Sequence, residues 1–221
     1  VPEYAVYDAE TLDLLFKGRD RDCTFRPVPV ISPDNDYLAH VCIEESTSSV
    51  LITESLTGEV VKELKGHTQS AGLASWSPDG SKLATASFDL TLRVWDVATG
   101  ETLTVFTGHT TPALVDWSPD GSRLVSGDAA GNVLVWDAET GGIVNRYNVG
   151  GSTFGNKWSP DGSRVLTTGW LDAPDIRPVW QSTKELIEYA YDCCVFRQLT
   201  PEERDQFGLP PAEDAEASSA P

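Results

Sequence analysis

Short runs of apolar, β-branched and aromatic residues alternate along this chain with clusters of Pro, Asp, Gly and Ser, a pattern typical of β-strands joined by turns. Between residues 113 and 147 the pattern predicts four strands, at Ala113–Trp117, Arg123–Gly127, Asn132–Trp136 and Ile143–Tyr147. The first two are joined by Ser-Pro-Asp-Gly, in which proline presets φ and glycine takes the left-handed conformation. We therefore expect small antiparallel units of four strands.

This unit repeats along the chain. The string Trp-Ser-Pro-Asp-Gly-Ser occurs three times, with Pro78, Pro119 and Pro160 each 41 residues apart. A degraded copy lies upstream, with Pro33 placed 45 residues before Pro78 and Asn35 in the glycine position. Other strings recur in a fixed order around the copies: Gly66-His67, Gly108-His109, Val94–Asp96, Val135–Asp137 and the weaker Val179–Gln181. A period of this length with several ordered strings indicates a repeat architecture.

The combination resembles the WD-repeat, or WD40, β-propeller family, whose blades have four strands and Gly-His and Trp-Asp strings. The resemblance extends from about residue 4 to residue 180. It implies an all-β fold, a partial WD40-type β-propeller with about four blades in this chain and a short C-terminal helical tail. The string at residues 197–203 is similar to the tail after the last blade in many bacterial WD-repeat proteins. The chain therefore resembles the C-terminal part of a bacterial WD40-repeat protein.

The family resemblance also implies a structural tetrad of a histidine, a serine or threonine, an aspartate and a tryptophan within one blade. In the second copy these positions match His67, Ser87, Asp89 and Trp95. The third copy keeps His109 and Trp136 but has Asp128 and Ala130 at the two middle positions, so we expect only one blade to contain the full network. The histidines are then structural groups that tie a loop to a turn through buried hydrogen bonds.

The strand pattern also predicts the domain organisation. Two strands, three units of four strands and a last unit of three strands indicate the end of an incomplete blade at residues 1–20 and propeller blades at 21–181. Residues 182–209 have helical periodicity after the capping box Ser182–Glu185, and predict a helical tail packed on the propeller. Residues 210–221, rich in Pro, Ala, Glu, Asp and Ser, predict a disordered tail. We expect the remaining propeller blades to come from an upstream segment or from another subunit.

The charge of the chain narrows the classes of partner. Its 221 residues include 34 acids and 16 bases, for a formal charge of −18. Such an acidic protein should be repelled by nucleic acids and by anionic membrane surfaces, so neither is an expected partner. No apolar run approaches the roughly 20 residues of a membrane span. The absence of a signal-peptide pattern and of Asn-x-Ser/Thr sites favours a cytoplasmic location.

The sequence lacks the motifs of catalysis. It has no Gly-x-Ser-x-Gly, Walker or Gly-x-Gly-x-x-Gly string, so we expect neither an enzyme nor a cofactor. Cys23, Cys42, Cys193 and Cys194 form no Cys-x-x-Cys pair, so no metal site is expected. We interpret these cysteines as small buried apolar residues.

The predicted function is a non-catalytic protein–protein interaction scaffold that binds a protein or peptide partner. The alternative is a sensor or regulatory propeller at the C-terminal end of a larger multidomain enzyme or signalling protein whose catalytic domain precedes Val1. We expect the partner surface on the face of the Gly-His loops. There a longer loop in the last copy contains Trp170 and Leu171, and the equivalent loop of another blade contains Phe88 and Leu90. Trp170 could be an aromatic anchor, or it could fold back onto its own blade.

Overall fold

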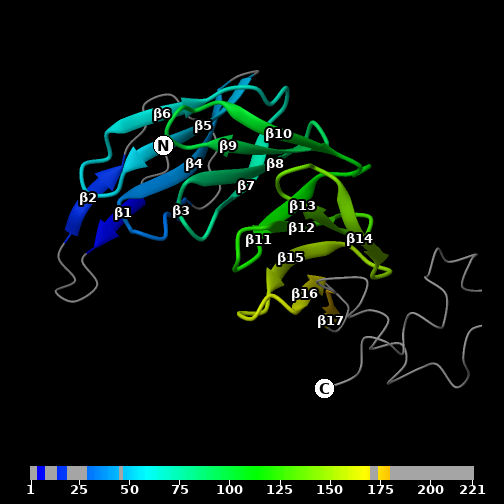
Figure 1. Cartoon of the computed structure of the whole chain (residues 1–221). Helices are drawn as coiled ribbons and strands as arrows, with labels where there is room; N and C mark the ends of the chain where they lie inside the picture. The colour runs from blue at the N-terminus through cyan, green and yellow to red at the C-terminus, as the bar shows by residue number, and fades with distance from the viewer. Residues whose placement is uncertain (1–3, 8–13, 19–28, 45–46, 170–173, 180–221) are drawn as a thin grey trace, which may run out of the picture. The chain divides into compact units, whose positions relative to one another are not determined.

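The computed structural model describes residues 4–7, 14–18, 29–44, 47–169 and 174–179, and in these residues all regular elements are β-strands. The strands form five antiparallel sheets (Figure 1). The first sheet has two strands, β1 (Tyr4–Tyr7) and β2 (Leu14–Gly18). The other four sheets follow in chain order and correspond to the four copies of the repeat, so we call them blades 1 to 4.

Each of blades 1 to 3 is a meander of four strands in which neighbours along the chain are hydrogen-bonded. Blade 1 consists of β3 (Val30–Ile31), β4 (Tyr37–Glu44), β5 (Thr47–Glu54) and β6 (Val60–Leu64). Blade 2 consists of β7 (Ala71–Trp76), β8 (Lys82–Ser87), β9 (Thr91–Asp96) and β10 (Thr102–Thr107).

Blade 3 consists of β11 (Ala113–Trp117), β12 (Arg123–Asp128), β13 (Asn132–Asp137) and β14 (Ile143–Asn148). The described part of blade 4 is β15 (Thr153–Trp158), β16 (Arg164–Gly169) and β17 (Asp175–Pro178). The sheets thus have two, four, four, four and three strands, and those of blade 3 lie within one residue of the positions predicted from the sequence.

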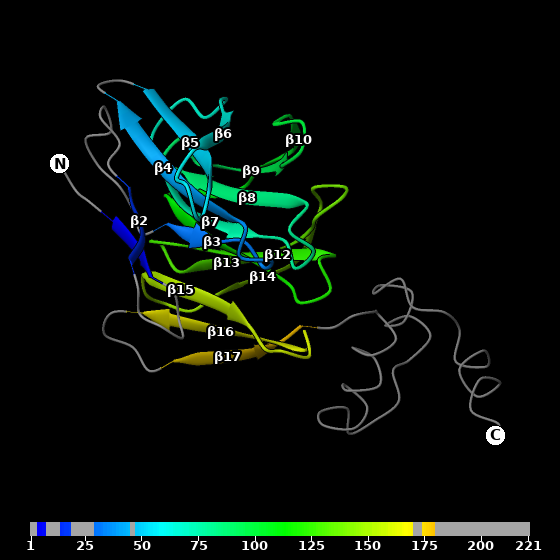
Figure 2. The same cartoon turned by 90° about the vertical axis from the view of Figure 1, so that its left-hand side faces the viewer.

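The apolar core lies between neighbouring blades. The first strands of the blades, β3, β7, β11 and β15, lie next to one another (Figures 1 and 2). Three apolar clusters fill the spaces between successive blades, and each takes buried residues from two of them. Trp95, for example, packs with Ile52 of blade 1, and Trp136 packs with Phe106 of blade 2. A blade is therefore stabilised mainly by its neighbours, as expected for repeat architectures.

The tryptophan of the repeated string joins one blade to the blade before it. The indole Nε1 of Trp76 donates to the backbone oxygen of Val30 at 3.0 Å, and that of Trp117 donates to the backbone oxygen of Ser75 at 3.0 Å. In blade 4 the buried Nε1 of Trp158 has no hydrogen-bond partner among the described residues. The indole bond between first strands is therefore made twice among the described residues. The first strands of blades 3 and 4 are joined instead through Asp116, whose carboxylate accepts from Nζ of Lys157 at 2.6 Å and from the backbone nitrogen of Trp158 at 3.4 Å.

The Ser-Pro-Asp turns have the conformation predicted for them. Gly80 has φ of 71°, and Asn35, which replaces glycine in blade 1, has φ of 67°. In each turn the aspartate accepts hydrogen bonds from the residues on either side; Asp79, for instance, accepts from the hydroxyl of Ser77 at 2.6 Å and from the backbone nitrogen of Ser81 at 3.1 Å. These bonds hold the pKa of the Asp79 carboxyl below its usual value. Turn formation therefore explains the recurring aspartates.

Several predictions concern residues outside the described part of the chain. The helical tail at 182–209, the disordered tail at 210–221 and the loop residues Trp170 and Leu171 all lie there. The interpretation of Cys42 as a free apolar residue is wrong, because Cys42 is buried and disulfide-bonded. Pairing depends on how distant segments approach one another, which the spacing of cysteines does not reveal. Since disulfides are typical of oxidising compartments, this bond does not favour the cytoplasmic location, which stays a prediction.

Candidate functional site

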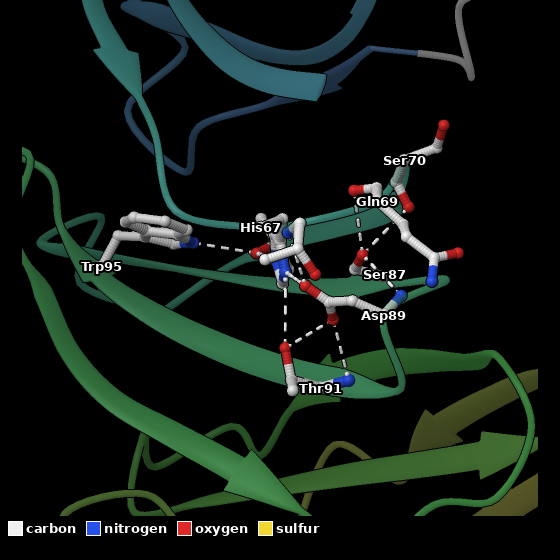
Figure 3. A network of polar contacts seen from close by, with 9 residues as sticks. His67, Gln69, Ser70, Ser87, Asp89, Thr91 and Trp95 are labelled. Atoms are coloured by element: carbon white, nitrogen blue, oxygen red, sulfur yellow. Dashed lines mark hydrogen bonds and ion pairs between the residues drawn. The ribbon is translucent and has the colours of Figure 1, made fainter. Parts of the chain in front are cut away.

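The loop between β6 and β7 is fastened to blade 2 by a network of polar side chains that begins at His67 (Figure 3). Nδ1 of His67 lies 3.0 Å from Oδ2 of Asp89, in the turn between β8 and β9. Nε2 of His67 lies 2.8 Å from the hydroxyl of Thr85 on β8. The same hydroxyl accepts a hydrogen bond of 2.8 Å from Nε1 of Trp95 on β9. One network therefore connects a loop, a turn and two strands.

The direction of each bond follows from the groups involved. The indole N–H can only donate and the carboxylate can only accept. The Thr85 hydroxyl therefore accepts from Trp95 and donates to Nε2 of His67, while Nδ1–H of His67 donates to Asp89. This arrangement requires a neutral imidazole. Burial lowers the pKa of His67 from its usual value, although Asp89 opposes the shift, and the neutral form is thereby favoured.

Asp89 is anchored from several sides. Besides its contact with His67, its carboxylate accepts from the backbone nitrogens of Thr68 and Thr91 and from the hydroxyl of Thr91, at 2.6–3.0 Å. Burial by itself would raise the pKa of Asp89, but the hydrogen bonds from Thr91, Thr68 and His67 outweigh it and hold the pKa well below its usual value. The turn that contains Asp89 is therefore fixed to the Gly-His loop.

Blade 3 contains the same network. Nδ1 of His109 lies 3.0 Å from Oδ2 of Asp128, and Nε2 lies 2.6 Å from the hydroxyl of Ser126. Nε1 of Trp136 donates to that hydroxyl at 2.7 Å. Burial lowers the pKa of His109 as it does that of His67. The expectation that only one blade has the full network is therefore wrong.

The assignment of Ser87 to the tetrad is also wrong, because the hydroxyl of the network belongs to Thr85. Trp95 pairs with Leu83 across the ladder, and its indole reaches two positions along β8, to Thr85. Ser87 lies two positions farther along, where its hydroxyl donates to the backbone oxygens of Gln69 and Ser70 at 3.1 Å. The structure brings His67, Asp89 and Trp95 together, but through a different hydroxyl.

A signal for the correct assignment was present in the sequence. Thr85 and Ser126 are hydroxyl residues 41 positions apart, at the period of the repeat. The carboxylate, in contrast, comes from two different positions: Asp89 is four residues after Thr85, and Asp128 is two residues after Ser126. Aligning the aspartates therefore misplaces the hydroxyl, whereas aligning the hydroxyls finds both networks.

Blade 4 does not complete this network within the described residues. Gly151 lies near the histidine position, and Thr167 follows Ser126 by 41 residues. The Thr167 hydroxyl is buried, and no described histidine or tryptophan is bonded to it. Among the described residues, the bonds that connect loop, turn and strands in blades 2 and 3 are therefore not made in blade 4.

Two apolar side chains flank Asp89 and point away from the core. Phe88 is 54% exposed and Leu90 is 38% exposed. Leu90 has φ of 68°, a left-handed conformation that is uncommon for residues other than glycine. In blade 3 the equivalent turn has Ala129 and Gly131 at these two positions, and Gly131 has φ of 82°. The turn of blade 2 therefore holds two large apolar residues where blade 3 has small ones.

The two histidines of the networks are fully occupied by structural bonds. Both ring nitrogens of His67 and of His109 are occupied by internal hydrogen bonds, so neither imidazole is available to take a proton from a substrate. Within the described ranges no group of three or more His, Cys, Asp or Glu residues could hold a metal ion. The same ranges contain no helix long and apolar enough to cross a membrane.

The four-stranded blades and the two networks agree with a WD40-type β-propeller. The family model described as "WD domain, G-beta repeat" matches residues 58–96 and 100–137. The resemblance to the WD40-repeat family is thereby confirmed. Each matched repeat includes the last strand of one blade and the first three strands of the next, since 58–96 contains β6 to β9 and 100–137 contains β10 to β13. The sequence repeat therefore overlaps two blades.

Individual relatives match short parts of the chain. Notchless protein homolog of Arabidopsis thaliana is 43% identical over 58 residues, which cover 26% of this chain and 12% of that protein. Denticleless protein homolog B of Xenopus laevis is 36% identical over 89 residues, which cover 39% of this chain and 12% of that protein. Both are eukaryotic, so these matches do not support the bacterial resemblance. The chain spans a small part of either relative.

A solved structure with the same fold is the crystal structure of a mitotic checkpoint complex. One of its chains superimposes with a TM-score of 0.65 at 20% identity, covering 75% of this chain and 50% of that chain. At this identity the likeness shows the fold alone.

Proposed function

We propose that this chain is a non-catalytic interaction scaffold that binds a protein or peptide partner through the turn between β8 and β9. The observation that carries the proposal is Leu90, an exposed leucine with φ of 68° at a position where the next blade has glycine. A non-glycine residue in this conformation costs roughly 1–2 kcal/mol. Strain of this kind is often found at sites where it serves a function.

The turn is also rigid, which suits a binding surface. Asp89, between the two exposed apolar residues, is anchored to His67, Thr68 and Thr91. The backbone nitrogen of Phe88 donates to the backbone oxygen of Ser70 at 2.9 Å. Phe88 and Leu90 are therefore held in place before a partner binds, and such preorganisation reduces the entropy lost on binding.

The composition of the turn agrees with an interface. Large apolar and aromatic side chains dominate the binding energy of protein interfaces, whereas loops that only connect strands are generally polar. The turn lies beside the Gly-His loop, on the face where the sequence predicts partner binding. Trp170 and Leu171 stay predicted members of this surface. The regulatory propeller of a larger enzyme, the blades from elsewhere and the exclusion of nucleic acids and membranes stay predictions as well.

The experiment is site-specific photo-crosslinking in cells that make the whole protein. A photo-reactive phenylalanine analogue replaces Phe88 in one sample and Val105, a 45% exposed residue of β10 in the same blade, in the other. We expect a discrete crosslinked product from position 88 that position 105 does not give. The same products from both positions, or none from position 88, would refute binding at this turn.

A further inference from the structure

Blade 1 differs from the other blades at its Ser-Pro-Asp turn. Blades 2, 3 and 4 continue after the aspartate with Gly-Ser and then a base, which is Lys82, Arg123 or Arg164. Blade 1 continues with Asn35, Asp36 and Tyr37. This turn therefore has one more acid and one base fewer than its counterparts. Asp34 accepts from the Ser32 hydroxyl and the backbone nitrogen of Asp36, but it lacks the bond from a second serine hydroxyl that the other turns have.

The turn between β5 and β6 lies directly beside it and is also unusual. Leu56, in this turn, is 63% exposed, and the equivalent positions of blades 2 and 3 are occupied by Ala98 and Glu139. The two turns of blade 1 are joined by Ser55, whose backbone nitrogen donates to the oxygen of Asp36 at 2.8 Å and whose hydroxyl donates to the oxygen of Asn35 at 2.5 Å. Their geometry is therefore fixed.

Together the two turns form a hollow of about 240 Å³, lined by Asp36, Tyr37, Glu54, Ser55 and Leu56. We call it the blade 1 hollow. Its lining combines an exposed leucine, an aromatic ring and two carboxylates. It lies at the end of the blades that carries the Ser-Pro-Asp turns, and the β8–β9 turn lies at the opposite end of β8 from such a turn. The blade 1 hollow is therefore separate from the surface of Phe88 and Leu90.

The negative charge of the hollow is not neutralised within the described residues. The Asp36 carboxylate has no hydrogen bond or ion pair there, and Glu54 only accepts a bond of 2.8 Å from the hydroxyl of Thr57. Lys62, on β6 of the same blade, instead donates to the backbone oxygen of Ala98 in blade 2 at 2.9 Å. A cation from another molecule would complement the hollow.

We propose that the blade 1 hollow binds an arginine side chain of a partner protein. A guanidinium group donates in a planar fork that fits carboxylates such as those of Asp36 and Glu54, and it also stacks on aromatic rings. Tyr37, which lines the hollow, is packed in part against the core and leaves only part of its ring for such a contact. The apolar stem of an arginine packs on exposed apolar surface of the kind that Leu56 provides. The charge of −18 on the whole chain further attracts a basic segment.

The test is an NMR titration of the isotope-labelled whole chain with N-acetyl-arginine amide. Its matched control is N-acetyl-citrulline amide, which has a similar shape but no charge. We expect saturable shifts at the amides of Asp36, Glu54 and Leu56, with a dissociation constant on the order of millimolar, since one side chain supplies little affinity. The dissociation constant of the citrulline compound should be at least about tenfold higher, because hydrogen bonds from a charged donor are stronger than those from a neutral one.

Two substitutions that introduce the residues of blade 2 test whether the arginine compound binds at the blade 1 hollow. Asp36→Ser and Leu56→Ala introduce the residues found at Ser81 and Ala98, so the fold tolerates them at equivalent turns. Asp36→Ser should weaken arginine binding about tenfold and Leu56→Ala several-fold. Glu139→Gln, which removes an exposed charge from the equivalent turn of blade 3, should leave binding unchanged.

Three results would overturn the proposal: equal binding of the citrulline compound, equal weakening by Glu139→Gln and Asp36→Ser, or shifts confined to other residues. The citrulline comparison uses the unmodified chain, so it decides the matter even if a variant folds poorly. The outcome is independent of crosslinking at position 88, because the two surfaces share no residue.

Discussion

The indole nitrogen of Trp117 donates a hydrogen bond of 3.0 Å to the backbone oxygen of Ser75, and so joins the first strands of blades 3 and 2. Trp158 is the equivalent residue of blade 4, and its indole nitrogen is buried without a partner among the described residues. Two tryptophans at the same position of the repeat thus differ in whether the indole nitrogen has an acceptor, and comparing them estimates the contribution of that bond.

Replacing Trp117 by phenylalanine should lower the free energy of unfolding by about 1–3 kcal/mol more than the same change at Trp158. Trp117→Phe leaves the part-buried Ser75 oxygen without this donor, and an acceptor left unsatisfied costs up to this amount. Trp158→Phe removes a group that has no bond to lose, and it serves as the control for the change in ring size. Urea unfolding of both variants measures the difference, and equal losses would show that the bond does not stabilise the contact between blades.

The hydroxyl of Thr85 should be more important for stability than that of Ser87. Thr85→Val keeps the shape of the side chain but leaves the N–H of Trp95 and Nε2 of His67 without a partner, so we expect a loss of about 2–4 kcal/mol. Thr85→Ser should restore most of it. Ser87→Ala should cost less, since the Ser87 hydroxyl bonds only to backbone groups, including the nitrogen of Asp89, and its loss leaves no indole or imidazole nitrogen without a partner. A larger loss for Ser87→Ala, measured by urea unfolding, would contradict the assignment of the network.

The fold should become less stable as the pH falls from 7 to 5. His67 and His109 have pKa values lowered by burial, so below about pH 6.5 the unfolded chain binds protons that the folded chain does not. The free energy of unfolding therefore decreases as the pH falls through this window. Asp89 and Asp128, whose pKa values are also lowered, add a second decrease below about pH 4.

The variant His67→Gln separates the contribution of His67 to the pH dependence of stability from that of the other ionisable groups. The variant lacks one of the two titrating imidazoles, so its free energy of unfolding should change less between pH 7 and pH 5 than that of the unmodified protein. Urea unfolding at both pH values gives the comparison. An identical pH dependence in the two proteins would show that His67 is protonated as easily in the fold as in the unfolded chain.

The strands and the family could be predicted from the sequence because the repeat shows the same pattern several times. The turn at Pro119 and the strand from Arg123 are recognisable from residues that are adjacent in the chain. The polar network was harder to predict from the sequence. The carboxylates of Asp89 and Asp128 both reach Nδ1 of the histidine in their blade, but they start from different positions in their turns. Only the three-dimensional path of each turn shows that they are equivalent.

The blade 1 hollow and the disulfide of Cys42 were not predicted at all. The hollow depends on two turns, around Asp36 and Leu56, that come together through bonds made by Ser55. Its signal was the missing base after the turn of blade 1, which becomes visible when Tyr37 is aligned with Lys82. A disulfide likewise depends on the distance between segments, which composition and spacing do not contain.

Blade 2 holds Leu90 in an unfavourable conformation, which by our proposal presents it, together with Phe88, to a partner. The most direct test is the variant Leu90→Gly, which copies Gly131 of blade 3, with two measurements on the same protein: the free energy of unfolding and the yield of the crosslink from position 88. We predict that the free energy of unfolding stays unchanged or rises by up to about 1 kcal/mol, because relief of the strain offsets the flexibility of glycine, while the crosslink decreases at least fivefold. A loss of more than about 1 kcal/mol with the crosslink intact would contradict the claim and show that Leu90 serves the stability of its own blade.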